Sequence, residues 1–492
     1  MTLFGVSLVC GCGPASPGGP SSRKFAASLG QSRTDLYLSP SEASGGKLCF
    51  NPDSPRLRAL LTAPRARASD PIDARGLSQD LPFLQDLLRL QYSGYAQIVQ
   101  RADFDLPLFF EQWQSTLVRA GATIPFDQGV LDPLRTLRAL FPDNHHAVWG
   151  PSLGEEPAFV VREYQAIVRS ADAVGALASC IARGAGTAFP HTLRLASVLR
   201  PEGTTLVLTV SVRGGGDRVS VQCPGGTFDL VPRPTLAKRA APTPMEELYA
   251  WRGLGDTAVI TVRRFAGTGA QEKQLERLVR DYDAHRRFAR IVFDLRGNGG
   301  GNDSAIYDWV AKAKRGLWSA GAEWELQGAL TPCQTWNVLV QRQIQDRTVD
   351  TPDARSERAK IRAEWPKGPH PATWLYRPGL IDGQAERPYS GQVFVLVDRY
   401  SGSSGESGAL TLKRALGATL IGERTDGTIE FSDQRTFILP HSGVRWSFGS
   451  KRNLFEEPVE GVGIPVDLYL ADPAAPVEQI VSMLTADRLL MH

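Results

Sequence analysis

The chain of 492 residues is too long for a single compact core, because domains usually hold ~100 to 200 residues, and we expect about three folding units. With 42% hydrophobic and 22% charged residues, the composition is typical of a soluble globular protein and excludes wholesale disorder. The net charge of +3, from 55 basic and 52 acidic side chains, provides no concentrated basic face, so we expect no nucleic-acid partner.

Residues 1–45 have the composition of an export signal followed by a flexible tether. A short apolar run, residues 3–13, includes Cys10 and Cys12 and is followed by a stretch rich in Ser, Pro and Gly. It resembles a bacterial lipoprotein signal, in which the cysteine after a small residue, here Cys12, becomes lipidated. This resemblance implies a periplasmic or outer-membrane lipoprotein of the cell envelope, or a secreted protein, that meets the membrane only through its anchor. The alternative is a disordered tail with chance cysteines.

Four further cysteines are present: Cys49, Cys180, Cys223 and Cys333. An even number fits an oxidising compartment, and four cysteines allow three pairings between which the sequence does not choose. None lies in a C-x-x-C pair or beside a histidine at the spacing of metal ligands. We therefore expect no zinc site, no other metal and no cofactor.

Residues 46–148 are predicted to form a helical domain. Apolar side chains recur every three or four residues in three stretches, 81–88, 106–117 and 130–141. This spacing places one apolar stripe on each of three helices. Such stripes are typical of a helical core and not of a ligand site.

Residues 149–240 are predicted to form a β-rich segment. Apolar and polar residues alternate most clearly over 204–212 (TTLVLTVSV), and the glycines 214–216 follow, which is the pattern of a β-hairpin. The segment is either a degenerate peptide-binding module of the PDZ type or a plain β spacer. Its end, residues 233–245, is rich in Pro and Ala and is predicted to be a linker.

Residues 241–492 alternate between strands and helices. We predict strands at 257–262, 290–295, 392–397 and 418–421, and helices at 272–282, 304–314 and 403–414. This alternation predicts an α/β domain with a mostly parallel sheet covered by helices. Ligand sites in such sheets lie beyond the carboxyl ends of the strands.

Two turns rich in glycine and serine follow strands of this sheet. In IVFDLRGNGGGND, residues 291–303, the glycines allow backbone N–H groups to approach a developing negative charge, and no phosphate-loop Lys and Ser/Thr pair follows. In VFVLVDRYSGSSGES, residues 393–407, Ser403 stands at the start of a predicted helix, whose positive end stabilises an alkoxide. Taken singly, each is as easily an ordinary turn.

The order of these segments resembles the tail-specific (C-terminal processing) serine protease family. Further similar blocks are ATLIGE (418–423), LPHSG (439–443), VEGVGIPVD (459–467) and YAWRGLGDTAVITVRRF (249–265). The resemblance implies a ClpP/crotonase-like catalytic domain that hydrolyses protein or peptide substrates through an acyl-enzyme. The family nucleophile is the serine three positions before the glutamate, which is Ser403 ahead of Glu406. By the same resemblance the oxyanion hole takes one N–H from Ser404 and another from Gly299 or Gly300.

No lysine stands where the Ser/Lys members of the family carry their general base. Thr428 occupies that position, and Lys413, ten residues after Ser403, faces away from it on the predicted helix. The chain is instead closer to the tricorn-like and interphotoreceptor retinoid-binding-protein-like branch. That branch takes a histidine from the helical domain and a carboxylate near the C-terminal end. The matching residues are His145, in LFPDNHH, and Glu460, in EGVGIPVD.

Two alternatives stay open at these positions. His146 is the rival base, and Glu460 either orients the imidazole or lies further from it. We expect other carboxylates to be structural: Glu406, Glu423, Asp294, Asp398 and Asp467. The sequence thus predicts an exported serine endopeptidase with Ser403 as nucleophile and His145 as base. The alternative is a non-catalytic or weakly catalytic protein of the same fold that binds a lipophilic or peptide ligand.

Overall fold

The computed structural model describes most of the chain from residue 36 onward. The described ranges are 36–38, 48–63, 67–101, 103–140, 143, 145–148, 161–168, 170–171, 174–183, 192–213, 219–232, 247–266, 270–328, 331–363, 374–456 and 459–486. The predicted export signal with Cys12, the glycines 214–216 and most of the predicted linker lie outside them. Among the described helices, none combines the length and the apolar character that crossing a membrane requires.

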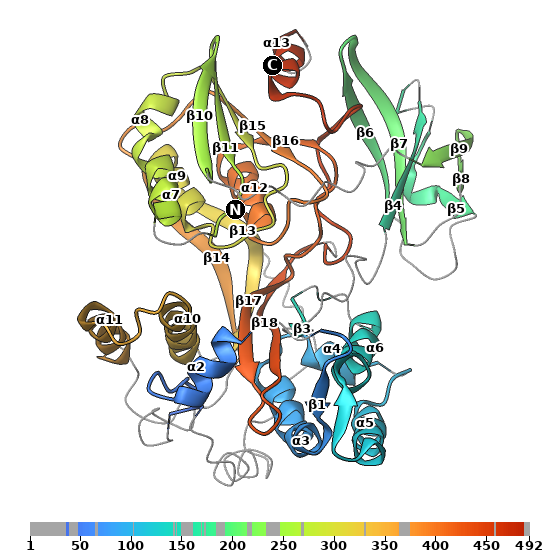
Figure 1. Cartoon of the computed structure of the whole chain (residues 1–492). Helices are drawn as coiled ribbons and strands as arrows, with labels where there is room; N and C mark the ends of the chain where they lie inside the picture. Colours follow the sequence, from blue (N-terminus) through green and yellow to red (C-terminus); the bar gives the residue numbers. More distant parts are fainter. Residues whose placement is uncertain are drawn as a thin grey trace, which may run out of the picture.

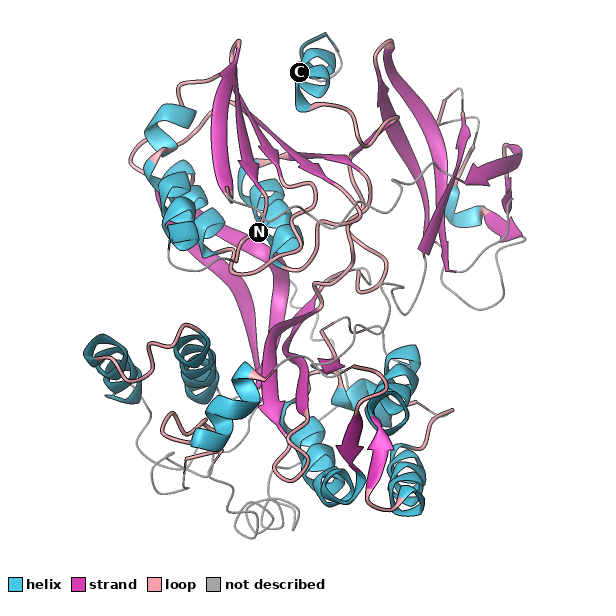
Figure 2. Cartoon of the chain, in the orientation of Figure 1, coloured by secondary structure: helices cyan, strands magenta, loops and turns pink. Residues whose placement is uncertain are grey.

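A mostly parallel sheet lies at the centre of the C-terminal half. Its strands follow the order β10, β11, β12, β15, β16 and β19, and among these pairs only β10 is antiparallel to its neighbour (Figures 1 and 2). The strands are β10 (Tyr249–Leu254), β11 (Thr257–Val262), β12 (Arg290–Asp294), β15 (Gln392–Val397), β16 (Thr419–Gly422) and β19 (Leu468–Leu470). The predicted α/β fold is therefore confirmed.

Helices cover both faces of this sheet. One face carries α7 (Ala270–Arg280), α8 (Tyr282–His285), α9 (Ser304–Ala313) and α12 (Ser404–Leu416), and the other carries α13 (Val477–Ala486). Successive residues of a strand point to opposite faces, so Ile260 of β11 packs with Trp309 of α9, whereas Val259 belongs to the cluster of α13. Because both faces are buried, the central strands, such as β15, are mostly apolar.

A second sheet, which the sequence analysis does not predict, is antiparallel. It consists of β14 (Trp374–Gln384), β13 (Arg315–Gly328), β18 (Arg445–Leu454) and β17 (Phe431–Ile438), in that order, and the short β3 (Ala147–Val148) pairs with β18. Also unpredicted are α2 (Pro55–Thr62), α10 (Thr331–Gln345) and α11 (Pro352–Ala363). The sheet runs between the mostly parallel sheet and the helices below it in Figure 1.

The N-terminal helices form one core together with this second sheet. They are α3 (Ala74–Gln91), α4 (Tyr95–Val99), α5 (Leu106–Ala120) and α6 (Asp132–Leu140). A π-helical turn, Asp127–Leu131, comes directly before α6. The short strands β1 (Pro71–Asp73) and β2 (Thr123–Pro125) pair with each other. Leu84, Leu117 and Leu134 of the predicted stripes pack in the same cluster as Trp446 and Phe448 of β18. The end of α6 is thereby held against the C-terminal half of the chain.

The middle segment is an antiparallel sheet that continues the mostly parallel one. It contains β4 (Val161–Ile167), β5 (Ile181–Arg183), β6 (Thr192–Arg200), β7 (Gly203–Arg213), β8 (Val219–Cys223) and β9 (Gly226–Pro232), and the run predicted at 204–212 forms β7. A short 3-10 turn, Leu177–Ser179, precedes β5. Strand β6 pairs in parallel with β19, which joins the two sheets. A disulfide links Cys180 to Cys223.

Candidate active site

Ser403 lies at the N-terminus of α12, directly after the turn that follows β15. Its φ of +51° lies in a region that residues with a side chain rarely adopt, and such strained positions concentrate at functional sites. The backbone N–H of Ser403 donates to Oε2 of Glu406 (3.0 Å), which helps to hold this conformation. The Oγ is thus presented at the positive end of a helix.

Glu406 is a fully buried carboxylate that holds the turn together. Besides the bond from Ser403, it accepts hydrogen bonds from the Thr425 hydroxyl (2.5 Å) and from the N–H groups of Gly427 and Thr428 (both 2.8 Å). Burial, and after it the charge of Asp426, raise the pKa of Glu406, while the hydrogen bonds oppose this rise. Glu406 therefore connects the start of α12 to the loop at 425–428.

His145 lies beside this serine although 258 residues separate them in the sequence. Its Nε2 is 3.2 Å from Ser403 Oγ. Two features of the second sheet hold it there: Ala147 and Val148 pair with β18, and Gln434 of β17 donates a hydrogen bond to the His145 carbonyl (3.1 Å). This is the distance at which an imidazole can take a proton from a hydroxyl.

His146, the rival base, faces the opposite way into the core. It is fully buried, and its Nε2 accepts a hydrogen bond from the Trp446 indole (2.8 Å). The rings of Tyr92 and Phe448 pack around it. Of the two adjacent histidines, only His145 contacts Ser403 in this structure.

The environment of His145 favours its neutral form. Burial lowers the pKa of the ring to about 4, whereas the Phe431 carbonyl and the charge of Asp433 act to raise it. The carbonyl approaches the ring without hydrogen-bonding geometry to Nδ1, which has no partner among the described residues. A neutral imidazole at neutral pH is the form that a general base requires.

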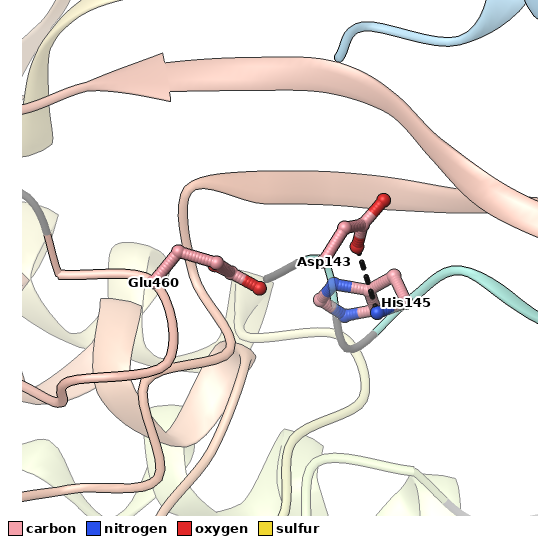
Figure 3. Close-up of side chains that lie close together, drawn as sticks. All are labelled: Asp143, His145 and Glu460. Carbon is pink, nitrogen blue, oxygen red and sulfur yellow. Dashed lines mark hydrogen bonds between the residues drawn. The ribbon is translucent and has the colours of Figure 1, made fainter. Parts of the chain in front are cut away.

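Two buried carboxylates, Asp143 and Glu460, lie next to His145 (Figure 3). One oxygen of each and one ring nitrogen of His145 all lie within 4.8 Å of one another. Asp143 Oδ1 accepts a hydrogen bond from the His145 backbone N–H (2.8 Å). Glu460 Oε2 accepts from the N–H groups of Ile429 (2.9 Å) and Glu430 (2.8 Å), which orient its carboxylate.

The charge around these carboxylates is partly compensated. Burial raises the pKa of Asp143 to about 6. The His145 N–H and the nearby Tyr92 hydroxyl act in the opposite direction and lower this pKa. The guanidinium of Arg138, at the end of α6, interacts electrostatically with both Asp143 and Glu460. Arg138 is not a residue that the sequence analysis selects, because no motif distinguishes it from the other arginines of the helices.

The two glycines considered for the oxyanion hole differ in their hydrogen bonds. The N–H of Gly300 donates to the side-chain oxygen of Asn298 (3.0 Å), whereas the N–H of Gly299 makes no hydrogen bond to the described residues. The Asn298 carbonyl also accepts from Gly402 N–H (2.9 Å), which links the two turns. Ser404 opens the first turn of α12, where helix N–H groups have no partner within the helix. Ser404 and Gly299 are therefore the pair with N–H groups to offer.

The remaining charged candidates have structural contacts. Lys413 pairs with Asp467 (2.6 Å), which also accepts a hydrogen bond from a backbone N–H of β16, so this lysine is engaged away from Ser403. Asp398 accepts from the backbone N–H groups of Gly297 (2.9 Å) and residue 400 (3.0 Å). Asp294 forms an ion pair with the guanidinium of Arg296 (2.8 Å).

Comparisons with known proteins place this site in context. Residues 325–469, which include Ser403 and Glu460, match the model of peptidase family S41. No curated protein sequence matches the chain.

Several solved structures show a distant similarity to the chain. Mature CPAF complexed with lactacystin is 14% identical, with a TM-score of 0.45 over 85% of this chain and 98% of that one. The photosystem II D1 C-terminal processing protease is 14% identical, with a TM-score of 0.39 over 85% and 98%. The tricorn protease is 12% identical, with a TM-score of 0.37 over 85% of this chain and 37% of its own.

Proposed function

We propose that the chain, whose residues 325–469 match the model of peptidase family S41, is a serine endopeptidase in which Ser403 is the nucleophile and His145 the general base. The observation that carries this assignment is the 3.2 Å separation of His145 Nε2 from Ser403 Oγ. The strained backbone of the serine at a helix N-terminus supports it, because both features favour an exposed and activated hydroxyl.

In the first half of the reaction, Ser403 Oγ attacks the carbonyl carbon of the scissile peptide bond and His145 Nε2 takes the hydroxyl proton. The carbonyl oxygen becomes an oxyanion, to which the N–H groups of Ser404 and Gly299 donate. One such donor contributes about 3 to 4 kcal/mol to transition-state stabilisation in serine hydrolases. The tetrahedral intermediate collapses when His145 returns its proton to the leaving amine, and the acyl chain remains on Ser403.

In the second half, water replaces the amine. His145 takes a proton from the water, whose oxygen attacks the acyl carbon, and the same proton then returns to Ser403 as the acid product leaves. Glu460, which has a carboxylate oxygen within 4.8 Å of a ring nitrogen of His145, stabilises the imidazolium formed in each half. Two backbone N–H groups fix the carboxylate of Glu460, so it needs little reorganisation when the ring becomes charged.

Export is the second part of the proposal. The disulfide between Cys180 and Cys223 supports it, because such bonds form and persist in oxidising compartments. In a bacterial host the wild type should fractionate with membranes through Cys12 and incorporate labelled fatty acid. The Cys12→Ala variant should lose the label, and equal labelling of both would contradict the anchor.

A carrier of an apolar ligand on the same fold is the alternative. A cavity of about 610 Å³ opens on the α13 side of the sheet, where a ligand could lie. Its wall contains three acidic and three basic side chains: Glu247, Arg252, Arg263, Asp294, Arg296 and Asp398. Such a lining favours polar groups, so this cavity does not support the alternative.

The test is labelling with an active-site fluorophosphonate together with cleavage of casein. We expect wild type to be labelled and active, Ser403→Ala to be neither, and His145→Ala to lose at least about a hundredfold in both rates, as general-base catalysis contributes 10²–10⁴-fold. His441→Ala is the matched control, because this histidine is exposed in the β17–β18 turn. Equal labelling of wild type and Ser403→Ala would refute the proposal.

A further inference from the structure

We infer that Asp143, His145 and Glu460 form a binding site for a divalent transition-metal ion such as Zn²⁺, and that the bound ion inhibits the peptidase. The carboxylates come from the end of the helical domain and from the C-terminal block, so the sequence spacing does not reveal the cluster. Metal binding itself does not depend on the proposed catalytic roles, whereas the inhibition rests on them.

The first reason is that the cluster holds buried polar atoms without partners. Both Asp143 Oδ2 and His145 Nδ1 are inaccessible to solvent and have no partner of hydrogen-bonding geometry among the described residues, and the Tyr92 hydroxyl, which lies near Asp143, has none either. Asp143 as a whole is fully buried. Unsatisfied groups of this kind are rare in proteins and cost about 1 to 3 kcal/mol each, so their persistence points to a ligand.

The second reason is the chemistry and spacing of the three groups. One imidazole and two carboxylates are a ligand set that zinc uses widely, with metal–ligand distances of about 2.0 to 2.2 Å. The three ligand atoms lie within 4.8 Å of one another, and Figure 3 shows the three side chains that carry them. Each has to move inward by less than about 1 Å to reach a shared ion, which side-chain torsions allow.

The surrounding contacts orient two of these ligands. Asp143 keeps Oδ1 on the His145 N–H, which leaves Oδ2 to face the ion, and Glu460 is held through Oε2. Partners of this kind typically raise metal affinity by 10- to 100-fold. Arg138 acts on both carboxylates and opposes a cation, so we expect reversible binding of modest affinity.

Inhibition follows from the two nitrogens of one ring. As a base, His145 carries its proton on Nδ1 and accepts the Ser403 proton at Nε2. An ion bound at Nδ1 uses that lone pair, so the neutral ring must carry its proton on Nε2, the atom that faces Ser403 Oγ at 3.2 Å. Nε2 then has no lone pair for the serine proton. The ion and the acylation step therefore exclude each other.

The test uses the untagged full chain carrying Ser403→Ala, which cannot digest itself, titrated with Co²⁺ as a visible-absorption probe for Zn²⁺. We expect one Co²⁺ per chain, displaced by Zn²⁺. Additional His145→Ala or Glu460→Gln changes should weaken binding by at least about tenfold. His441→Ala in the same background is the matched control and should bind as its parent does. Circular dichroism confirms that each variant is folded.

The second readout is peptide cleavage by the wild type. Zn²⁺ should inhibit it and EDTA should restore it. No Co²⁺ spectrum, or one that survives His145→Ala, overturns the metal site. A spectrum that requires His145, in a chain whose wild type cleaves nothing, supports the metal site and refutes the peptidase assignment instead.

Discussion

Replacing Glu406 with glutamine should impair both stability and catalysis, although the side chain keeps its shape. Four donors converge on the carboxylate: the N–H groups of Ser403, Gly427 and Thr428 and the hydroxyl of Thr425. Only the ionised carboxylate accepts all four hydrogen bonds, and because burial raises the pKa of Glu406 to about 8, the comparison applies above that pH. An amide has one oxygen, so its NH₂ group must face two of these donors.

The magnitude follows from the two bonds that are lost. A hydrogen bond to a charged group contributes about 1.5 to 3 kcal/mol, so losing two lowers the free energy of unfolding by about 3 to 6 kcal/mol. Domains have only about 5 to 15 kcal/mol in total. Where the lost pair includes the bond from Ser403, the positive φ of the serine loses its support and kcat should fall more than KM rises.

The assays are urea unfolding and steady-state peptide cleavage at about pH 9, above the raised pKa of Glu406. Glu276→Gln is the matched control, because Glu276 lies exposed on α7 and should leave both unchanged. A Glu406→Gln chain with the unfolding midpoint and kcat of the wild type would show that the carboxyl does not hold the turn as an ionised acceptor.

Three further predictions concern other parts of the chain. The pH profile of kcat/KM should fall on acidification with a midpoint near pH 4, because burial lowers the pKa of His145 to about 4 and only the neutral ring accepts a proton; a midpoint near 6.5 would contradict this. Gly300→Ala should abolish activity, since its φ is +103° and the new Cβ would lie 2.7 Å from the Cβ of the proposed nucleophile, whereas Gly299→Ala, with no atom within 4 Å, should be tolerated. Wild-type rates for Gly300→Ala would refute the close approach of the two turns. Replacing Cys180 and Cys223 by alanine should destabilise the middle segment by about 2 to 4 kcal/mol, given a separation of 43 residues, and an unchanged thermal unfolding profile would count against it.

Local patterns were sufficient for the parallel sheet. All four strands and three helices predicted between residues 257 and 421 are found, with ends shifted by at most two residues. The reason is that runs such as 392–397 are buried on both faces and apolar throughout, and helices such as α9 show a clear apolar stripe. The antiparallel sheet was missed because its long strands mix exposed, partly buried and buried residues without a regular period, as in β17.

The catalytic candidates divide in the same way. Ser403, the glycine turn and the absence of a family lysine can be recognised in the sequence, because each lies within one strand–turn–helix unit whose residues are neighbours in the chain. The choice of His145 over His146 depends on the pairing of β3 with β18 and on the Trp446 indole that binds the second ring.

At the outset, 492 residues and a charge of +3 predicted only several folding units and no concentrated basic face. The motifs then predicted the α/β fold, which the structure confirms, and a candidate nucleophile. Only the tertiary structure brought His145 across 258 residues to 3.2 Å from Ser403 and gathered Asp143 and Glu460 behind it. Such contacts depend on how separate elements pack, and no local spacing in the chain encodes the distance between them.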